Sequence, residues 1–343
     1  MTYSMTSTPL ATIEGMPRFR ALLGPTPLEE AKALSHHLGG PRIFLKRDDL
    51  TAVGLGGNKV RKLEFIIGRV LAEGGDTLVV IGGYQSNLAR ISTAMAIRAG
   101  LKVELVLGGV PGEPRDVTGN LLLSHLLGAN IHYVETEPRW EFGSYVDDLA
   151  ARLESEGRKV AVMPLGGATP EGIAGYVLAT AELMQQFDEQ QIAPSRLIVS
   201  VGSGGTYCGL VLGECNLGPS YKVTGISVSR PADYLRDATI AATAAARDAL
   251  GLSHAPTVSM LDINDAYVGD HYGALTDQAR EAIQLVARLE GVFLDPVYSG
   301  KGMSGLIGLI RSGEIGPDET VVFLHTGGSP ALFAYDAARL LAS

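Results

Sequence analysis

Lys59 stands at the end of a glycine-rich turn, where its side-chain amine could carry out carbonyl chemistry. Residues 54–59 read Gly-Leu-Gly-Gly-Asn-Lys, and the run VRKLEFIIGRVL that follows is predicted to be helical. A lysine amine in a dry pocket has a lowered pKa and then reacts with carbonyl compounds. A nucleotide-binding P-loop would require Ser or Thr after the lysine, but Val60 stands there. Most lysines at turns are solvated surface charges, so this reactivity requires a shaped, dry pocket around Lys59.

A second glycine-rich segment, residues 202–206, has the pattern of an anion-binding turn. It follows an apolar β-branched run and precedes a predicted helix, so backbone N–H groups and the positive helix end would face a ligand. Its members are Gly202, Ser203, Gly204, Gly205 and Thr206. Tyr207 occupies the position at which a dinucleotide motif requires glycine. We therefore predict a phosphate site here, with a plain glycine turn as the alternative.

Other segments place polar side chains beside predicted turns or strand ends. Residues 84–87 (YQSN) begin a predicted helix and could bind a carboxylate or only cap the helix. Residues 295–301 (DPVYSGK) form either a functional loop or a surface turn. His325 follows a late strand, where a structural hydrogen bond is the simpler interpretation. Asp48 and Asp49 are a candidate acid–base pair, although a role in the following turn is more common.

The elements that would position these residues alternate between strands and helices. Apolar β-branched runs predict strands at 77–83, 101–107, 130–135, 160–165, 196–202, 221–229 and 320–328. Helices are predicted at 86–99, 118–127, 144–156, 172–187, 205–216 and 276–290. This alternation predicts an α/β fold with two open, mostly parallel, twisted sheets flanked by helices. Ligands of such sheets bind beyond the carboxyl ends of the strands, so residues 82–87, 202–206 and 325–329 would gather into one site.

Composition and charge exclude several other classes of protein. The 343-residue chain has 28 Lys and Arg against 37 Asp and Glu, a net charge of −9, which argues against binding nucleic acid or a membrane surface. No apolar run approaches the ~18 residues of a membrane span, and the N-terminal residues lack the apolar core of a signal peptide. Cys208 and Cys215 fall on one predicted helix. We therefore expect no disulfide, no metal site and a reduced, cytoplasmic setting.

Seven runs in order resemble the D-cysteine desulfhydrase and 1-aminocyclopropane-1-carboxylate (ACC) deaminase family. They are LKRDDLT, GGNKVRKLEF, QSN, PLGGATPEGIAGY, GSGGT, LDPVYSGK and HTGGSPALFAY, and the resemblance extends from about Thr26 to Tyr335. This family belongs to the fold-type II enzymes, which use pyridoxal 5′-phosphate. The resemblance implies that cofactor, a small amino-acid substrate and a homodimer. We expect a large domain of residues 1–58 and 169–343 and a small domain of residues 59–168.

The resemblance also implies a role for each matching residue. Lys59 would hold the cofactor covalently and move the α-proton, Ser86 would assist near the α-carbon, and Tyr298 and Tyr272 would lie beside the ring and the substrate. Asn87 would bind the cofactor's 3′-oxygen, and residues 202–206 would cradle its phosphate. Ser299 or Thr326 would face the ring nitrogen. Substrate binding would fall to Gln85, Ser86, Asn87 and Leu88.

Three positions guide the choice of reaction. ACC deaminases carry Glu and Leu where this chain has Ser299 and Thr326, so the resemblance favours the desulfhydrases. A hydroxyl at the ring nitrogen gives a weaker electron sink than a carboxylate, which suffices for a good leaving group such as a thiol. Leu88 replaces the usual His or Gln and disfavours an anionic side chain nearby.

We expect β-elimination from D-cysteine to pyruvate, ammonia and sulfide. L-cysteate sulfo-lyase, then ACC deaminase, and a non-catalytic cofactor- or amino-acid-binding protein are the alternatives.

Overall fold

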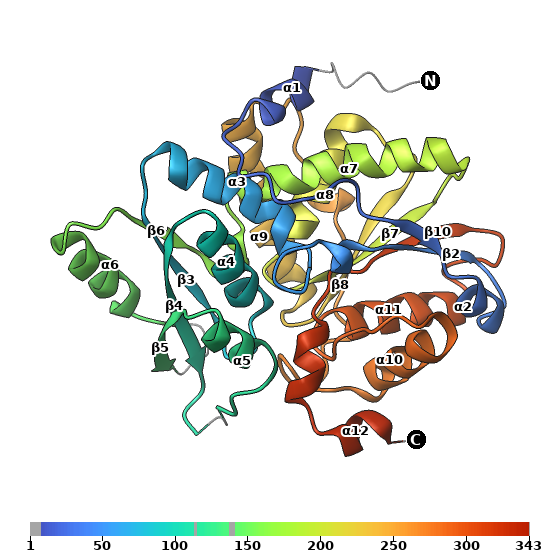
Figure 1. Cartoon of the computed structure of the whole chain (residues 1–343). Helices are drawn as coiled ribbons and strands as arrows, with labels where there is room; N and C mark the ends of the chain where they lie inside the picture. The colour runs from blue at the N-terminus through green and yellow to red at the C-terminus, as the bar shows by residue number, and fades with distance from the viewer. Residues whose placement is uncertain (1–7, 113–114, 137–140, 343) are drawn as a thin grey trace.

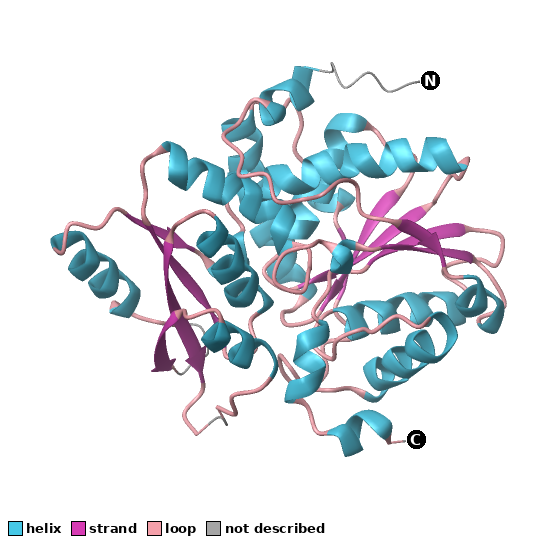
Figure 2. Ribbon diagram, viewed as in Figure 1, coloured by secondary structure: helices cyan, strands magenta, loops and turns pink. Residues whose placement is uncertain are grey.

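The computed structural model describes residues 8–112, 115–136 and 141–342, and contains two sheets, each flanked by helices (Figure 1, Figure 2). Its strands are β1 (Leu28–Glu30), β2 (Arg42–Lys46), β3 (Thr77–Gly83), β4 (Lys102–Gly109), β5 (Asn130–Glu135), β6 (Val160–Met163), β7 (Arg196–Val201), β8 (Lys222–Ser227), β9 (Asp262–Asn264) and β10 (Thr320–Leu324). Its helices are α1 (Thr8–Glu14), α2 (Lys32–His37), α3 (Lys59–Ala72), α4 (Asn87–Arg98), α5 (Gly119–Leu126), α6 (Tyr145–Ser155), α7 (Pro170–Gln190), α8 (Gly205–Leu217), α9 (Ala232–Leu250), α10 (Asp277–Glu290), α11 (Ser299–Arg311) and α12 (Ala337–Leu341).

The larger sheet has the strand order β1-β2-β10-β7-β8-β9. All of its pairs are parallel except the edge pair β1–β2. Helices α2, α10 and α11 cover one face, and α7, α8 and α9 cover the other (Figure 1). Because both faces are covered, the central strands are continuous apolar runs, as expected for a parallel sheet.

The smaller sheet has the order β5-β4-β3-β6 and is entirely parallel. Alternate residues of β3 face opposite sides: Leu78 and Val80 pack with α3 and α4, whereas Val79 packs with α6. This sheet and its helices lie on the left of Figure 1. The fold class predicted from the sequence is confirmed.

The chain passes between the two sheets twice. It leaves the larger sheet after β2, forms α3 and the whole of the smaller sheet, and returns through α7. Helix α3 touches both halves, because Val60 and Leu63 pack with the smaller sheet while Phe65 packs with α7. Because α3 packs against both halves, the expected boundary between a large and a small domain at residues 58/59 and 168/169 stays a prediction.

Some local expectations were wrong. Strand β6 ends at Met163 because Pro164 has no N–H to donate to a neighbouring strand. Residues 295–301 are not a surface turn, since Asp295, Ser299 and Lys301 are fully buried and α11 begins at Ser299.

None of the described helices is long and apolar enough to cross a membrane. Residues 1–7, used for the signal-peptide expectation, lie outside the described part of the chain.

Candidate active site

A cavity of about 600 Å³ opens between the two sheets, at the carboxyl ends of their strands. It is lined by residues from β3, α4, the β7–α8 turn and the segments around Tyr272, Tyr298 and Thr326. Most of the residues singled out from the sequence line it, namely Lys59, Ser86, Asn87, Leu88, Gly202, Ser203, Gly204, Gly205, Thr206, Tyr272, Tyr298 and Thr326. The predicted meeting of three strand ends from both halves is confirmed.

Lys59 is the first residue of α3 and projects into this cavity. The surrounding protein lowers the pKa of its amine to about 8, because burial removes water from the charged form. A substantial fraction of this amine is therefore free near neutral pH. That is the protonation state required for attack on a carbonyl carbon.

The turn between β7 and α8 forms a cradle beside Lys59, since the hydroxyl of Thr206 accepts from the side-chain amide of Asn58 at 2.9 Å. Gly204 has a φ of +86°, a left-handed conformation that favours glycine, and α8 begins at Gly205. A Cβ at Gly205 would collide with the amine of Lys62 and would lie 3.0 Å from the Cα of Ala168. Glycine at this position therefore lets α8 begin close against Lys62 and Ala168, and the backbone N–H groups of the helix start could bind an anion.

Lys62 is a residue that the sequence interpretation missed. Its side chain is fully buried behind the cradle and its amine donates to the carbonyl of Gly166 at 2.5 Å. Burial holds the pKa of Lys62 well below its usual value, and the nearby amine of Lys59 lowers it further. The sequence did contain a signal, namely the spacing between Lys59 and Lys62, because residues three apart on a helix lie on the same face.

The start of α4 forms a third wall. Ser86 caps the helix, accepting from the backbone N–H of Ala89 at 3.1 Å, so the predicted cap is confirmed. Gln85 is not among the described residues that line the cavity. Its amide donates to the carbonyl of Thr118 and accepts from the N–H of Asn120, which ties α5 to α4. Its predicted part in substrate binding is not supported by this placement.

Two tyrosines meet on the side of the larger sheet. The hydroxyls of Tyr272 and Tyr298 lie 2.6 Å apart, and their rings pack edge to face at 6.0 Å. Burial raises the pKa of Tyr298 to about 12, so it stays protonated and can donate. Ser299, next in the chain, is fully buried with its hydroxyl donating to Asp295 at 2.7 Å and does not line the cavity. Of the two residues expected near a ring nitrogen, only Thr326 lies in the cavity wall.

His325 has the structural role that was the simpler interpretation. It is fully buried, its Nδ1 accepts from the N–H of Gly327, and its Nε2 lies 3.1 Å from the carbonyl of Phe293. Burial lowers its pKa, so the ring is neutral and donates through Nε2. The neighbouring carbonyl of Thr326 accepts from the backbone N–H of Asn58, which holds the Lys59 loop against this strand end.

Asp48 does not act with Asp49 as an acid–base pair facing the cavity. It is fully buried and accepts from Arg61 and from the hydroxyls of Thr26 and Tyr176. The Arg61 guanidinium keeps the pKa of Asp48 below its usual value despite burial. Because Arg61 follows Lys59 by two residues, this ion pair secures the first turn of α3.

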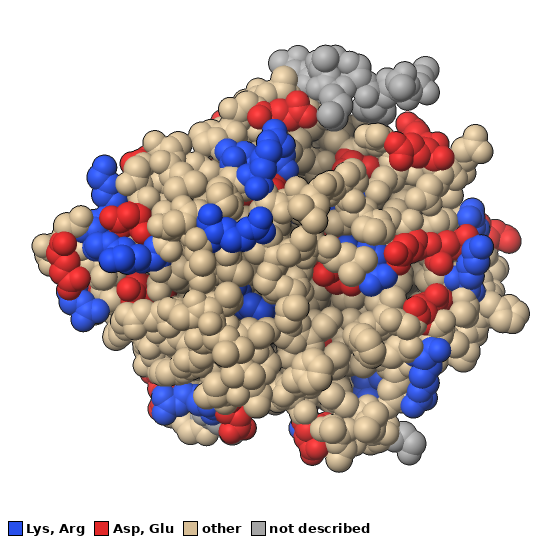
Figure 3. Space-filling view, viewed as in Figure 1, with Lys and Arg blue, Asp and Glu red and all other residues tan. Residues whose placement is uncertain are grey.

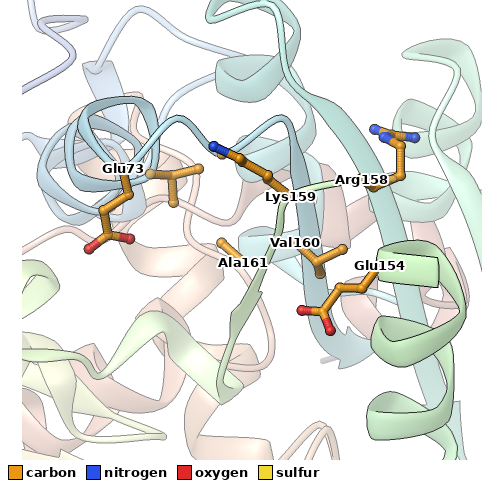
Figure 4. Close-up of a pocket in the computed structure, with 8 residues that line it drawn as sticks. Glu73, Glu154, Arg158, Lys159, Val160 and Ala161 are labelled. Carbon is orange, nitrogen blue, oxygen red and sulfur yellow. The ribbon is translucent and has the colours of Figure 1, made fainter. Parts of the chain in front are cut away.

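A second, smaller hollow of about 350 Å³ lies beside the edge strand β6 (Figure 4). Figure 4 shows Glu73 just after α3, Glu154 on α6, and Arg158 and Lys159 just before β6, with their charged ends spread apart. Arg158 pairs with Asp76 instead of pointing at a shared centre. No residue expected to do chemistry lines this hollow.

A lysine with a lowered pKa beside a glycine-rich helix start is the arrangement expected of an enzyme site for a phosphorylated carbonyl compound. The chain belongs to the pyridoxal-phosphate dependent enzyme family, whose model matches residues 20–327. Its cofactor is pyridoxal phosphate, and the site fits that group, because Lys59 offers an amine and the glycine turn an open phosphate cradle.

Individual relatives agree with this assignment. The chain is 39% identical over 332 residues to the D-cysteine desulfhydrases of Salmonella typhi and Salmonella newport, covering 95% of this chain and 98% of each of them. A crystal structure described as an ACC deaminase homologue superposes with a TM-score of 0.89 at 34% identity, covering 97% of this chain and 98% of that one. Threonine deaminase isoform 2 from Solanum lycopersicum shares the fold, with a TM-score of 0.67 at 18% identity over 97% of this chain and 85% of its own.

Proposed function

We propose that the protein is a carbon–sulfur β-lyase that converts D-cysteine and water to pyruvate, ammonia and hydrogen sulfide. The observation that carries this proposal is the cavity itself, which places Lys59, the glycine cradle and the tyrosine pair around one space. The 39% identity with D-cysteine desulfhydrases over nearly the whole chain supports the choice of substrate. The bound cofactor would supply an electron sink for the negative charge that develops at the α-carbon.

The residues of the chain would divide the remaining work. Lys59 would remove the α-proton, since its lowered pKa leaves a free amine near neutral pH. The backbone N–H groups at the start of α4 and the hydroxyl of Ser86 would hold the substrate carboxylate. The linked hydroxyls of Tyr272 and Tyr298 would donate a proton to the departing thiolate, because Tyr298 keeps its proton at neutral pH.

Thr326 would face the ring nitrogen of the cofactor. It is in the cavity wall, whereas the hydroxyl of Ser299 donates to Asp295 and accepts from the Asp295 backbone N–H. A hydroxyl leaves that nitrogen largely neutral, which limits the electron sink. A thiol leaving group tolerates this limit better than the opening of a cyclopropane ring does, so ACC deamination is less favoured.

A second candidate is an L-cysteate sulfo-lyase, and Arg230 is the observation that favours it. This residue lines the cavity with its guanidinium 5.2 Å from the ring of Tyr234, where it could meet a sulfonate. Leu88 on the facing wall is apolar and favours the neutral thiol. A protein that bound only an amino acid would have no use for a lysine held partly deprotonated.

The assembly would be a cytoplasmic homodimer. Exposed apolar side chains cluster on segments that contact one another: Leu55 on the Lys59 loop, Phe293, Phe333 and Leu126 of α5. Phe333 is 78% exposed and Leu126 73% exposed. In Figure 3 the region over α5 and residues 329–334 is largely uncharged, with charges toward the margin. Such a surface suits a second copy of the chain.

Borohydride reduction tests the central role of Lys59. The reduced protein should carry the cofactor on the peptide that contains Lys59. Lys301 is the comparison, because its pKa is also lowered to about 8 but it does not line the cavity, so it should carry no cofactor. Lys59→Ala should abolish labelling and lower kcat by at least about a hundredfold, while Lys301→Met keeps the label on Lys59. Wild-type turnover by Lys59→Ala would refute the proposal.

A further inference from the structure

Arg90 is a fully buried arginine on α4, one turn after Asn87. Its partners are all neutral oxygens. Its Nε donates to Oδ1 of Asn120 at 2.6 Å, and its terminal nitrogens donate to Oδ1 of Asn87 at 3.3 Å and to the carbonyls of Gly54 and Gly56.

Arg90 takes part in none of the ion pairs within the described residues. Burial lowers the pKa of Arg90 to about 10, so it keeps its charge at neutral pH. A buried, unpaired charge is costly and calls for a functional reason.

The contacts of Arg90 fix which way the side-chain amide of Asn87 points. A guanidinium has donors only, so the atom of Asn87 that faces it must be the oxygen. The same reasoning orients Asn120, whose oxygen faces Arg90 and whose nitrogen then donates to Oδ1 of Asn87 at 3.0 Å. Two donors therefore converge on the Asn87 oxygen. Its N–H₂ group is left for the cavity that Asn87 lines.

Arg90 also holds the loop that leads to Lys59. Gly54, Leu55 and Gly56 have φ values of +57°, +64° and +70°, a run of left-handed residues that is unfavourable, above all for leucine. The two glycine carbonyls of this loop accept from Arg90. One buried side chain thus connects the loop before Lys59 with the donor group of Asn87.

We infer that Arg90 is a positioning residue: it fixes Asn87 with its N–H₂ group toward the cavity and ties that donor to the loop carrying Lys59. This inference rests on the proposed function and on the role expected for Asn87 from the family resemblance, which is to bind the 3′-oxygen of the cofactor. The buried charge of Arg90, passed on through the polarised amide, strengthens that hydrogen bond. Arg90 is not among the described residues that line the cavity, so it acts only through its neighbours.

The test measures the loss of cofactor from the holoenzyme and the pH titration of the bound cofactor's visible absorbance. Arg90→Met should release the cofactor about tenfold faster and raise the pKa of that titration by about one unit, because the anionic oxygen loses its oriented donor. Asn87→Ala should do the same. The double variant should shift little beyond the larger single effect, since both changes remove one interaction. Arg98→Met, on the exposed end of α4, should match the wild type.

Asn120→Asp separates positioning from simple support of the fold. The new carboxylate pairs with Arg90, so the unfolding temperature should hold or rise, but it presents an acceptor to the Asn87 oxygen and should still weaken cofactor binding. This variant decides the matter if Arg90→Met does not fold. Wild-type cofactor loss in folded Arg90→Met or in Asn120→Asp would overturn the inference, as would full additivity with Asn87→Ala. Failure of Lys59 labelling in the wild-type protein would instead overturn the proposed function.

Discussion

In the proposed function Lys59 carries the central chemistry, and its surroundings determine whether it is an ordinary surface charge or a nucleophile. It begins a helix, lines the cavity and is desolvated enough to lower its pKa to about 8. Lys62, one turn later, is fully buried, and its own pKa is held well below its usual value by burial and by the nearby amine of Lys59. The free amine is thus available without a neighbouring general base.

The rate at which cofactor-free protein captures pyridoxal phosphate should depend on pH through this group. The pKa of Lys59 is lowered from 10.5 to about 8, and only the neutral amine attacks the carbonyl carbon. Capture should therefore be slow at pH values well below 8, rise through about 8 and level off above it. Stopped-flow absorbance over a pH series measures this directly. A midpoint close to 10.5 would show that the cavity does not desolvate the lysine.

At this scale the sequence allowed prediction that Lys59 and the turn glycines would lie at one site and that Ser86 would cap a helix, because their local motifs determine their positions. It did not allow prediction of side-chain direction. Gln85 and Ser299 belong to the recognised motifs, yet they hydrogen-bond within the protein and not into the cavity. Lys62 and Arg90 became visible only through their tertiary partners.

We expect cofactor retention to depend strongly on the turn from β7 to α8. Gly205→Val should release the cofactor at least about tenfold more readily, because the new side chain would meet Lys62 and Ala168 and displace the backbone N–H groups. Equilibrium dialysis or the visible absorbance of the purified variant measures the loss. Gly316→Ala, at a glycine with room for a methyl group, is the matched control. Equal cofactor affinity in both variants would argue against the cradle.

Among the elements, those with strong apolar periodicity were predicted correctly, and α11 shows why others were not. The loop expected at residues 295–301 includes the first residues of α11, where Gly302 and Gly305 let the helix lie directly on the larger sheet. A Cβ at Gly302 would collide with Ser200, and one at Gly305 with Ile226. These glycines serve close packing, which overrides their low helix propensity. Such tertiary contacts cannot be seen in a local window of sequence.

The whole molecule consists of two α/β halves whose strand ends face one cavity, and the same assembly leaves an apolar surface uncovered. Phe333→Asp should convert the proposed dimer to a monomer, because a charge at the centre of an apolar contact loses its hydration. Light scattering after size-exclusion chromatography gives the mass. Ile97→Asp, near the end of α4 that lies away from the cavity, should leave the dimer intact. A monomeric wild-type protein would contradict the proposed assembly.

The reaction itself is the property that the fold and the cavity jointly explain, and its substrate is the most direct test. Purified protein should be assayed with D-cysteine, L-cysteine, L-cysteate and ACC, measuring the keto acid together with sulfide or sulfite. We expect the highest kcat/KM for D-cysteine, equal amounts of pyruvate and sulfide, and no turnover by Lys59→Ala. A higher kcat/KM for L-cysteate with release of sulfite, or keto acid from ACC alone, would contradict the proposed desulfhydrase activity.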